Sequence, residues 1–559
     1  MLLALDFLLI QNLQNLENLE KIKNFLCKIL TQTAHTFELE TQILQTDTSF
    51  TLEAKGEEQN LLDFTNALSA SLPLSLQWTF KELRILKALS PTHSLPSPQE
   101  SSNLLTPLEL EKVTQKDSST FCNLWESFID FTPQKVTFLK DNQKLPLNNP
   151  KELQESLQHL STLLKNKQSI FLKTPLGKKE VILFDENNPP KIQSPYIFVP
   201  FCLNNAQSLF KISTEECQAL ATLEKPLITL KPKSILKALF PTHEVPCILP
   251  FDPILLLLSK FLESHSGFYL IEPSQKLSNG ICQFFKTDDT PLEISVGKNS
   301  LILKHHFKAT PTTATCPELL AFKNTIKSQN LTQTNALYLG KHPTHFMLYF
   351  NQSFKTPIEF TLQTNLAQIL EILKTQNPTT QSLLKNFTKA NETLISQLES
   401  LPPHDRFSSN LLDLLGLCAI LLDLHAPFPF TPNFDLNLKA ATKALLQKAG
   451  EFVGAKGPRI DFRLEKDKEG KIYLDTLRTL RSVMSFKLAG VESELLCFGI
   501  LDSMAEFFAN LSRDMEENYS TKGIIICGEM FLNKQFLDQF IHYLPKDSEV
   551  LGCEIMDFI

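Results

Sequence analysis

The chain of 559 residues has few glycines and few arginines. Glycine accounts for 16 residues, about 3% where about 7% is usual, and there are only seven arginines. Glycine-rich loops let the backbone approach a bound phosphate closely, and arginine is the usual bidentate partner of phosphate and carboxylate groups. The sequence therefore offers few places for an anion-binding loop, and its first 400 residues hold one arginine, Arg84.

Paired cysteines and an excess of positive charge are also missing. The eleven cysteines are irregularly spaced and none forms a Cys-x-x-Cys pair, so the sequence fits neither a disulfide framework nor a zinc finger. The formal charge of −7, from 54 basic and 61 acidic residues, argues against a general nucleic-acid binder and a polybasic membrane-surface protein. Nucleic acid is therefore not an expected partner.

No segment predicts a membrane span. The apolar start Met1–Ile10 is short, lacks a basic leader and contains Asp6, so it indicates a strand rather than a signal peptide. The apolar stretch Leu411–Leu424 contains Asp413 and Asp423, and it is too short and too charged to cross a bilayer. We expect a cytoplasmic protein.

The length indicates three or four domains of a mixed α/β (α+β) chain. Hydrophobic spacing in the first 90 residues predicts the order β-α-β-β-α-β, the ferredoxin-like arrangement. Residues 91–152 are rich in Pro, Ser, Thr and Asn and indicate a linker with an irregular subdomain. Strands and helices mix over 153–316, with a helix entered after Ser213 as N-cap. Residues 317–559 are more helical and include a hairpin turning at Glu469-Gly470.

Several segments of the first half, taken in order, resemble one known family. Gly56–Pro73 is similar to the second helix of an acylphosphatase-type domain. Glu215–Leu230, which contains Lys-Pro-Leu-Ile, and Cys247–Leu258, which contains Leu-Pro-Phe-Asp-Pro, resemble consecutive segments of a YrdC-like domain. That domain belongs to the NiFe-hydrogenase maturation carbamoyltransferases, the HypF family. Leu270–Ser274 stands where this family has a further strand.

Three later segments extend the resemblance to the carbamoyl-transfer domain of the same family. They are Arg406–Leu417, Asn437–Ala449 and Ile524–Asn533, each similar to a segment at the corresponding place. The resemblance implies an acylphosphatase-like domain over 1–90, a degenerate zinc-subdomain remnant over 91–152 and a YrdC-like domain over 153–316. It also implies a shortened carbamoyltransferase-like domain of the actin/sugar-kinase type over 317–559.

The residues that carry the family's chemistry are largely absent. The family's carbamoyl-phosphate loop supplies backbone N–H groups and an arginine, but the corresponding Gln11–Leu16 has neither glycine nor arginine. Only Cys122 stands in the region of the zinc-binding cysteines, and one thiolate cannot make a four-ligand site. We therefore expect no zinc and no other metal.

Some residues correspond to remnants of the family's binding sites. In the YrdC-like region these are Lys225 and Ser274, although the asparagine that accompanies the serine is missing, and a solvated lysine cluster is the simpler explanation of Lys225. In the carbamoyl-transfer region Glu529 replaces a glycine, and its carboxylate would repel a nucleotide phosphate, which puts ATP binding in doubt. The remnants of the nucleotide site there are Cys527, Gly528, Asn533, Ser408, Ser409 and Asp413.

Two histidine pairs, His342–His345 and His305-His306, have spacings that could suit a metal, but Pro343 opposes the helix that the first would need. Cys527 falls at a strand-to-helix turn, and we expect a buried apolar thiol rather than a nucleophile. No catalytic residue is assigned.

The resemblance implies a role in assembling a NiFe hydrogenase. The losses lead us to expect a non-catalytic maturation factor that binds a hydrogenase subunit or another maturation protein. One alternative is an active, divergent carbamoyl or acyl transferase that uses ATP and carbamoyl phosphate. The other is a YrdC-like RNA-binding module, which the net charge disfavours.

Overall fold

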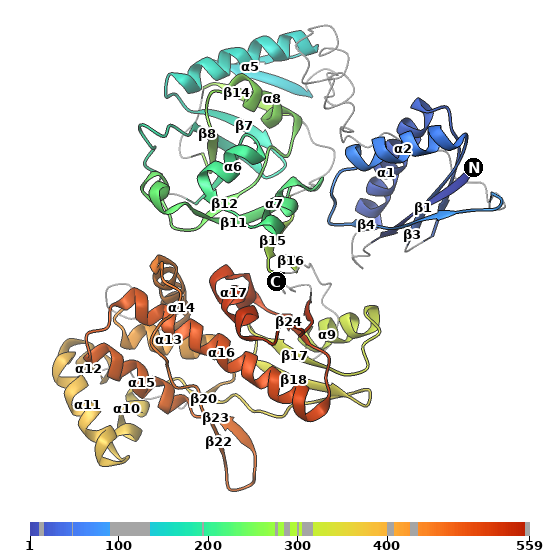
Figure 1. The fold of residues 1–559 in the computed structure, drawn as a ribbon. Helices are drawn as coiled ribbons and strands as arrows, with labels where there is room; N and C mark the ends of the chain where they lie inside the picture. Colours follow the sequence, from blue (N-terminus) through green and yellow to red (C-terminus); the bar gives the residue numbers. More distant parts are fainter. Residues whose placement is uncertain are drawn as a thin grey trace. The chain divides into compact units, whose positions relative to one another are not determined.

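The computed structural model forms two compact units, Met1–Leu292 and Glu293–Ile559, which we call the N-terminal and C-terminal units (Figure 1). Both mix helices and sheets, so the multidomain α/β class expected from the sequence is confirmed. The structure describes residues 1–9, 16–46, 49–89, 135–192, 195–273, 278–283, 291–298, 301–304, 317–399, 407–424 and 434–553.

The N-terminal unit begins with a four-stranded antiparallel sheet, ordered β2-β3-β1-β4, that carries two helices. The order of elements along the chain is β-α-β-β-α-β, as the hydrophobic spacing predicts. Its core packs alternate residues of β1, such as Leu5 and Phe7, against Phe25 and Phe64 of the helices. The elements are β1 (Leu2–Leu9), α1 (Leu16–Thr36), β2 (Glu40–Gln45), β3 (Ser49–Lys55), α2 (Glu58–Ser71) and β4 (Trp78–Ile85).

A second sheet of the N-terminal unit runs in the order β11-β12-β9-β13-β8-β7-β14-β5-β6. Its strands are β5 (Val136–Lys140), β6 (Gln143–Pro146), β7 (Ile170–Thr174), β8 (Gly177–Leu183), β9 (Tyr196–Pro200), β11 (Leu227–Pro232), β12 (Val245–Cys247), β13 (Gly267–Ile271) and β14 (Gly280–Gln283), and β10 (Phe210–Lys211) pairs with β11. The helices are α5 (Pro150–Lys165), α6 (Leu203–Leu209), α7 (Thr214–Ala221), η1 (Ser234–Leu239) and α8 (Pro253–Phe261). The sheet therefore begins inside residues 91–152, and the four-part division from the sequence stays a proposal.

The two faces of this second sheet are covered differently. On one face α5 and α8 bury a continuous apolar core, which includes Leu157, Leu172 and Leu258. Part of the other face carries interlocking aromatic rings, with Phe198 and Tyr269 5.2 Å apart between ring centroids. The N-cap of helix α7 is Ser213, whose side chain and that of Glu216 form a reciprocal capping box, as the sequence predicts.

The C-terminal unit has a five-stranded sheet, ordered β19-β18-β17-β24-β25, in which β17, β24 and β25 are parallel. Helix α9 packs on one face of β24, and the large helical core is built against the other. The sheet strands are β17 (Thr334–Tyr338), β18 (His345–Phe350), β19 (Ser353–Lys355), β24 (Ile524–Cys527) and β25 (Val550–Gly552). Three short antiparallel pairs are β15 (Glu293–Val296) with β16 (Ile302–Lys304), β20 (Leu362–Gln363) with β21 (Phe407–Ser408), and β22 (Leu464–Lys466) with β23 (Ile472–Leu474). The helices are α9 (Pro317–Ser328), α10 (Leu366–Lys374), α11 (Pro378–Ala390), α12 (Glu392–Glu399), α13 (Leu411–Leu421), α14 (Phe434–Glu451), α15 (Thr476–Leu488), α16 (Ser493–Tyr519), η2 (Glu529–Leu532) and α17 (Lys534–Tyr543).

Among the described residues, one helix is long and apolar enough to cross a membrane. This helix is α16, and 83% of its most apolar window is buried inside the structure. Residues such as Ile500, Met504 and Phe508 contribute directly to the core of the C-terminal unit. A core helix passes the same test of length and composition, and burial of this extent favours that explanation.

Candidate functional site

The candidate site lies in the C-terminal unit, where the neighbouring parallel strands β17 and β24 end. Tyr338 and Cys527 are their last paired residues. The loops that follow are held together by hydrogen bonds from Leu339 N to Cys527 O, at 2.9 Å, and from Met530 N to Leu339 O, at 3.1 Å. The carboxyl ends of parallel strands are where open α/β sheets bind ligands, because loops and backbone N–H groups converge there.

Gly528 makes the close approach of these two loops possible. Its backbone has φ 109° and ψ 158°, a conformation that is almost restricted to glycine. A Cβ atom at this position would collide with the carbonyl oxygen of Leu339. Gly528 therefore has a structural role that does not depend on a bound ligand.

Glu529 fills the loop that the two strand ends form. Its Oε2 accepts a hydrogen bond of 2.8 Å from the backbone N–H of Lys341, and its Oε1 lies 3.6 Å from Lys341 Nζ. A Cβ at Gly340 would collide with Oε2, so the carboxylate lies directly against the loop backbone. A backbone N–H next to a lysine ammonium is a typical arrangement for holding a phosphate. Here the chain's own carboxylate occupies it.

Two buried groups next to this loop are held in their neutral forms. Burial, followed by the nearby carboxylate of Glu529, raises the pKa of the Tyr338 hydroxyl. A hydrogen bond with Cys553, followed by burial, raises the pKa of the Cys527 thiol well above its usual value. A thiol with a raised pKa is a poor nucleophile. Cys527 thus acts as a core residue, which agrees with the interpretation of its sequence position.

Ser408, Ser409 and Asp413 lie at the start of α13 and join the same loop from the other side. The carbonyl of Ser409 accepts a hydrogen bond of 2.8 Å from Thr344 N, and Leu411 N donates to Thr344 Oγ1 at 3.0 Å. Ser408 Oγ donates to Asp413 Oδ2 at 2.5 Å. The hydroxyl of Ser408, at the end of β21, and the carboxylate of Asp413, in the first turn of α13, are therefore engaged with each other.

The last residue expected at this site, Asn533, is the N-cap of α17. Its Oδ1 accepts a hydrogen bond of 2.9 Å from Phe536 N. This is the ordinary role of an asparagine at the start of a helix. The six residues expected in this region therefore do gather around loop 339–344 and loop 528–533, but several of their polar atoms serve the fold.

The sequence interpretation did not identify loop 339–344 as the centre of this site. A buried strand, Thr334–Tyr338, ends two residues before Gly340-Lys341, and this was the signal in the sequence. A loop of this kind can approach an anion with its backbone. The pair His342 and His345 belongs to this region. His342 Nδ1 lies 3.9 Å from Glu318 Oε1, and burial lowers the pKa of His345. Within the described part of the chain, no group of three or more His, Cys, Asp or Glu side chains is arranged to hold a metal.

Of the two residues expected as a remnant in the N-terminal unit, the structure describes Lys225. Lys225 lies in a left-handed turn with φ 45°, and its Nζ donates to Ala221 O at 3.4 Å. Burial lowers its pKa. Its ammonium group is thus folded back onto the end of α7. Ser274 and His305-His306 lie outside the described residues.

The sequence interpretation also missed a row of lysines on the second sheet. Lys178 of β8, Lys173 of β7 and Cys282 of β14 are neighbours in register and so share one face. Both lysines are exposed, and Lys178 Nζ lies 4.1 Å from the ring centroid of Phe171. Glu180, on the same face, is buried, and its Oε2 has no hydrogen-bond partner among the residues that the structure describes. Strand register, which the sequence does not contain, brings these residues together.

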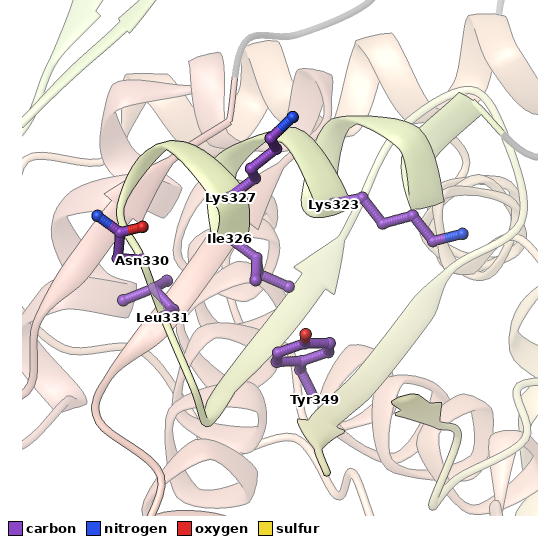
Figure 2. Close-up of a pocket in the computed structure, with 6 residues that line it drawn as sticks. All are labelled: Lys323, Ile326, Lys327, Asn330, Leu331 and Tyr349. Carbon is purple, nitrogen blue, oxygen red and sulfur yellow. The ribbon is translucent and has the colours of Figure 1, made fainter. Parts of the chain in front are cut away.

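A surface pocket of about 400 Å³ lies at the opposite end of the C-terminal sheet. Figure 2 shows Lys323 and Lys327 of α9 above Tyr349, which pairs with Thr334 at the start of β17. The two ammonium groups point away from the tyrosine ring (Figure 2). Ligand sites have polar groups that converge on one point, and the two ammonium groups of this pocket do not converge.

Comparisons with known proteins agree with this architecture. No family model matches the chain. Over 99% of its length it is similar to full-length HypF in its phosphate- and nucleotide-bound form (TM-score 0.61, 11% identity) and to T. kodakarensis HypF (TM-score 0.57, 10% identity), with 96% of each of those chains covered. The fold is therefore that of HypF, which confirms the resemblance inferred from the sequence segments. Protein HydE of Wolinella succinogenes is 31% identical over 509 residues, or 89% of both chains. The chain belongs to the family of protein HydE.

Proposed function

We propose that this chain is an accessory factor for the maturation or assembly of a NiFe hydrogenase and that it does not catalyse carbamoyl transfer. It acts in the cytoplasm by binding a hydrogenase subunit or another maturation protein. The HypF fold and the resemblance of its segments to the maturation carbamoyltransferases support a role in hydrogenase maturation. The placement of Glu529 against Lys341 is the observation that supports the loss of catalysis.

The electrostatics of the loop explain why Glu529 is decisive. A phosphate at the strand ends needs the Lys341 N–H and the lysine ammonium, and Glu529 already uses both. An entering phosphate would also have to approach a carboxylate, and two like charges at such a distance repel strongly. A nucleotide would bind only after Glu529 leaves the loop.

The N-terminal sheet supports the same proposal. Arg84 is the one arginine among the first 400 residues, and its guanidinium donates to Asp6 from Nε at 2.5 Å and from Nη2 at 3.0 Å. The hydrogen bonds from Arg84 lower the pKa of Asp6, and they are the largest cause of its shift. Since this guanidinium is committed to an internal carboxylate, it is not available to hold an acyl phosphate.

The proposal is tested by affinity capture of the tagged full-length chain from its native cells. We expect a hydrogenase subunit or a maturation protein to be enriched from cells that express the hydrogenase and to be lost from matched cells that do not. The purified protein should also release no pyrophosphate from ATP when carbamoyl phosphate is added. Absence of these partners while they are expressed would contradict the role in assembly.

The alternative of an active transferase makes the opposite prediction in the second assay. Pyrophosphate release that depends on both ATP and carbamoyl phosphate would establish it and would overturn the non-catalytic proposal. The alternative of an RNA-binding module has the exposed lysines Lys173 and Lys178 in its favour. It predicts an RNA affinity that falls steeply with salt and that drops when both lysines are replaced by glutamine.

A further inference from the structure

Strand β4 forms an edge of the N-terminal sheet. In the described part of the chain it pairs with β1, and no strand pairs with its other side. Seven of its eight residues are exposed. An edge strand of this length presents a row of backbone N–H and C=O groups that can pair with another strand. Proline or a very short length would prevent this, and β4 has neither.

The exposed edge is also apolar on one face. Phe80, Leu83 and Ile85 are 52%, 45% and 72% exposed. They lie opposite Phe7, Leu5 and Leu3 of β1, which are buried beneath the helices. The three residues of β4 therefore lie on the core face of the sheet, but the helices do not cover them. Exposed apolar residues on an unpaired edge are a feature of association surfaces.

The charges on β4 identify a second copy of this chain as the occupant. We propose that β4 pairs antiparallel with β4 of a second molecule, so that Lys81 of each copy faces Glu82 of the other. In this register Phe80 of each copy also faces Leu83 of the other, which joins the apolar faces. The two-fold symmetry produces every contact twice.

The register is specified by the charges themselves. A shift by one residue in one direction would place Lys81 opposite Lys81, and a shift in the other direction would place Glu82 opposite Glu82. Like charges directly opposite each other destabilise a strand pair, whereas opposite charges stabilise it. Within one strand Lys81 Nζ lies 3.5 Å from Glu82 Oε1, and both side chains are about half exposed. An exposed pair of this kind contributes little, so each side chain can exchange it for the oppositely charged side chain of the second copy. The bulge at Lys81 adds twist to β4, and paired ribbons of two strands accommodate strong twist.

The test is the oligomeric state of the full chain, measured by sedimentation equilibrium. We expect a dimer whose dissociation constant rises by roughly tenfold in Lys81→Glu and in Glu82→Lys, because each substitution creates two like-charge contacts. An equimolar mixture of the two variants should dimerise again, since each Glu then faces a Lys. The double variant Lys81→Glu/Glu82→Lys should also recover dimerisation.

Lys55→Glu is the matched control. It reverses an exposed charge in the same sheet but on β3, where Lys55 pairs with Glu40 on the surface, and it should leave the dimer intact. A wild-type protein that stays monomeric at its highest soluble concentration would overturn the proposal. A dimer that the single charge reversals do not weaken would also overturn it, because β4 would then not form the interface. The edge of β4 would in that case be free for another occupant, such as an apolar peptide.

Discussion

Glu529 and Lys341 are joined twice, once through the backbone N–H of the lysine at 2.8 Å and once through its ammonium group at 3.6 Å. They stand 188 positions apart in the chain. Both contacts lie at the carboxyl ends of β17 and β24, the place where a sheet of this kind binds phosphate. Three predictions concern this part of the C-terminal unit, and a fourth concerns Asp252 of the N-terminal unit.

Removal of the Glu529 side chain should open the site to anions. In Glu529→Gly the N–H and the ammonium of Lys341 lose their internal partner, and we expect ATP and inorganic phosphate to bind at least roughly tenfold more tightly than to the wild type. Isothermal titration calorimetry on the full chain measures this gain. Adding Lys341→Ala to the variant should remove much of the gain, because the ammonium is lost while the backbone N–H remains. Equal ATP affinity of the wild type and Glu529→Gly would show that the carboxylate does not block the site.

Gly528→Ala should destabilise the C-terminal unit by about 3 kcal/mol, because the new Cβ collides with Leu339 O and the backbone conformation suits only glycine. Gly470→Ala is the control, with φ 85° and no atom within 4 Å of the new Cβ, and it should cost about 1 kcal/mol. Urea unfolding followed by circular dichroism measures both. Equal losses for the two variants would contradict the steric argument.

Asn533→Ala should lower the stability by about 1 kcal/mol, since it removes the acceptor that caps α17. Asn533→Asp should retain the cap and most of the stability. If Asn533 instead holds a ligand, both variants would leave stability unchanged and alter ligand affinity. Thermal unfolding without added ligand distinguishes the two roles.

The stability of the N-terminal unit should fall as the pH rises from about 4 to about 7. Burial raises the pKa of Asp252 from 3.8 to about 7, against weaker opposing effects of the N–H groups of Leu255 and Ile254. In this interval the unfolded chain has released the proton that the folded chain still holds, so increasing pH favours unfolding. Below and above the interval this contribution is constant.

Asp252→Asn removes the titration while it keeps an N-cap for α8. Between pH 4 and pH 8 the stability of the variant relative to the wild type should therefore increase, by an amount on the order of 3 kcal/mol. Asp252→Ala, which loses the cap as well, should be less stable than Asp252→Asn at every pH. Parallel stability curves for Asp252→Asn and the wild type would contradict the assignment.

Local patterns were sufficient to predict much of the fold. The alternation and helical spacing of the first 90 residues predicted the split β-α-β-β-α-β sheet, because each pattern states which side of its element is buried. Ser213 predicted the start of α7, since a capping box depends on residues three apart. Gly470 predicted a turn because glycine readily adopts a positive φ, and its φ is 85°.

The features that the sequence did not predict depend on contacts between distant segments. Strands β5 and β6 lie in a stretch whose composition suggested a linker, and they form because β14 pairs with β5. The negative charge of Glu529 was recognised as unfavourable to a nucleotide, but its bond to Lys341 depends on the adjacent alignment of β17 and β24. The apolar residues of α16 are buried against neighbouring helices, and the sequence does not state which helices these are.

Because Glu529 is part of the chain, it acts as a tethered ligand of the loop that it fills. A tethered group has an effective concentration of about millimolar or more. A free phosphate or nucleotide must therefore compete with an occupant that never diffuses away. Small changes in cellular nucleotide levels would leave such a loop unaffected, and only an event that moves η2, such as the docking of a partner, would expose the Lys341 N–H.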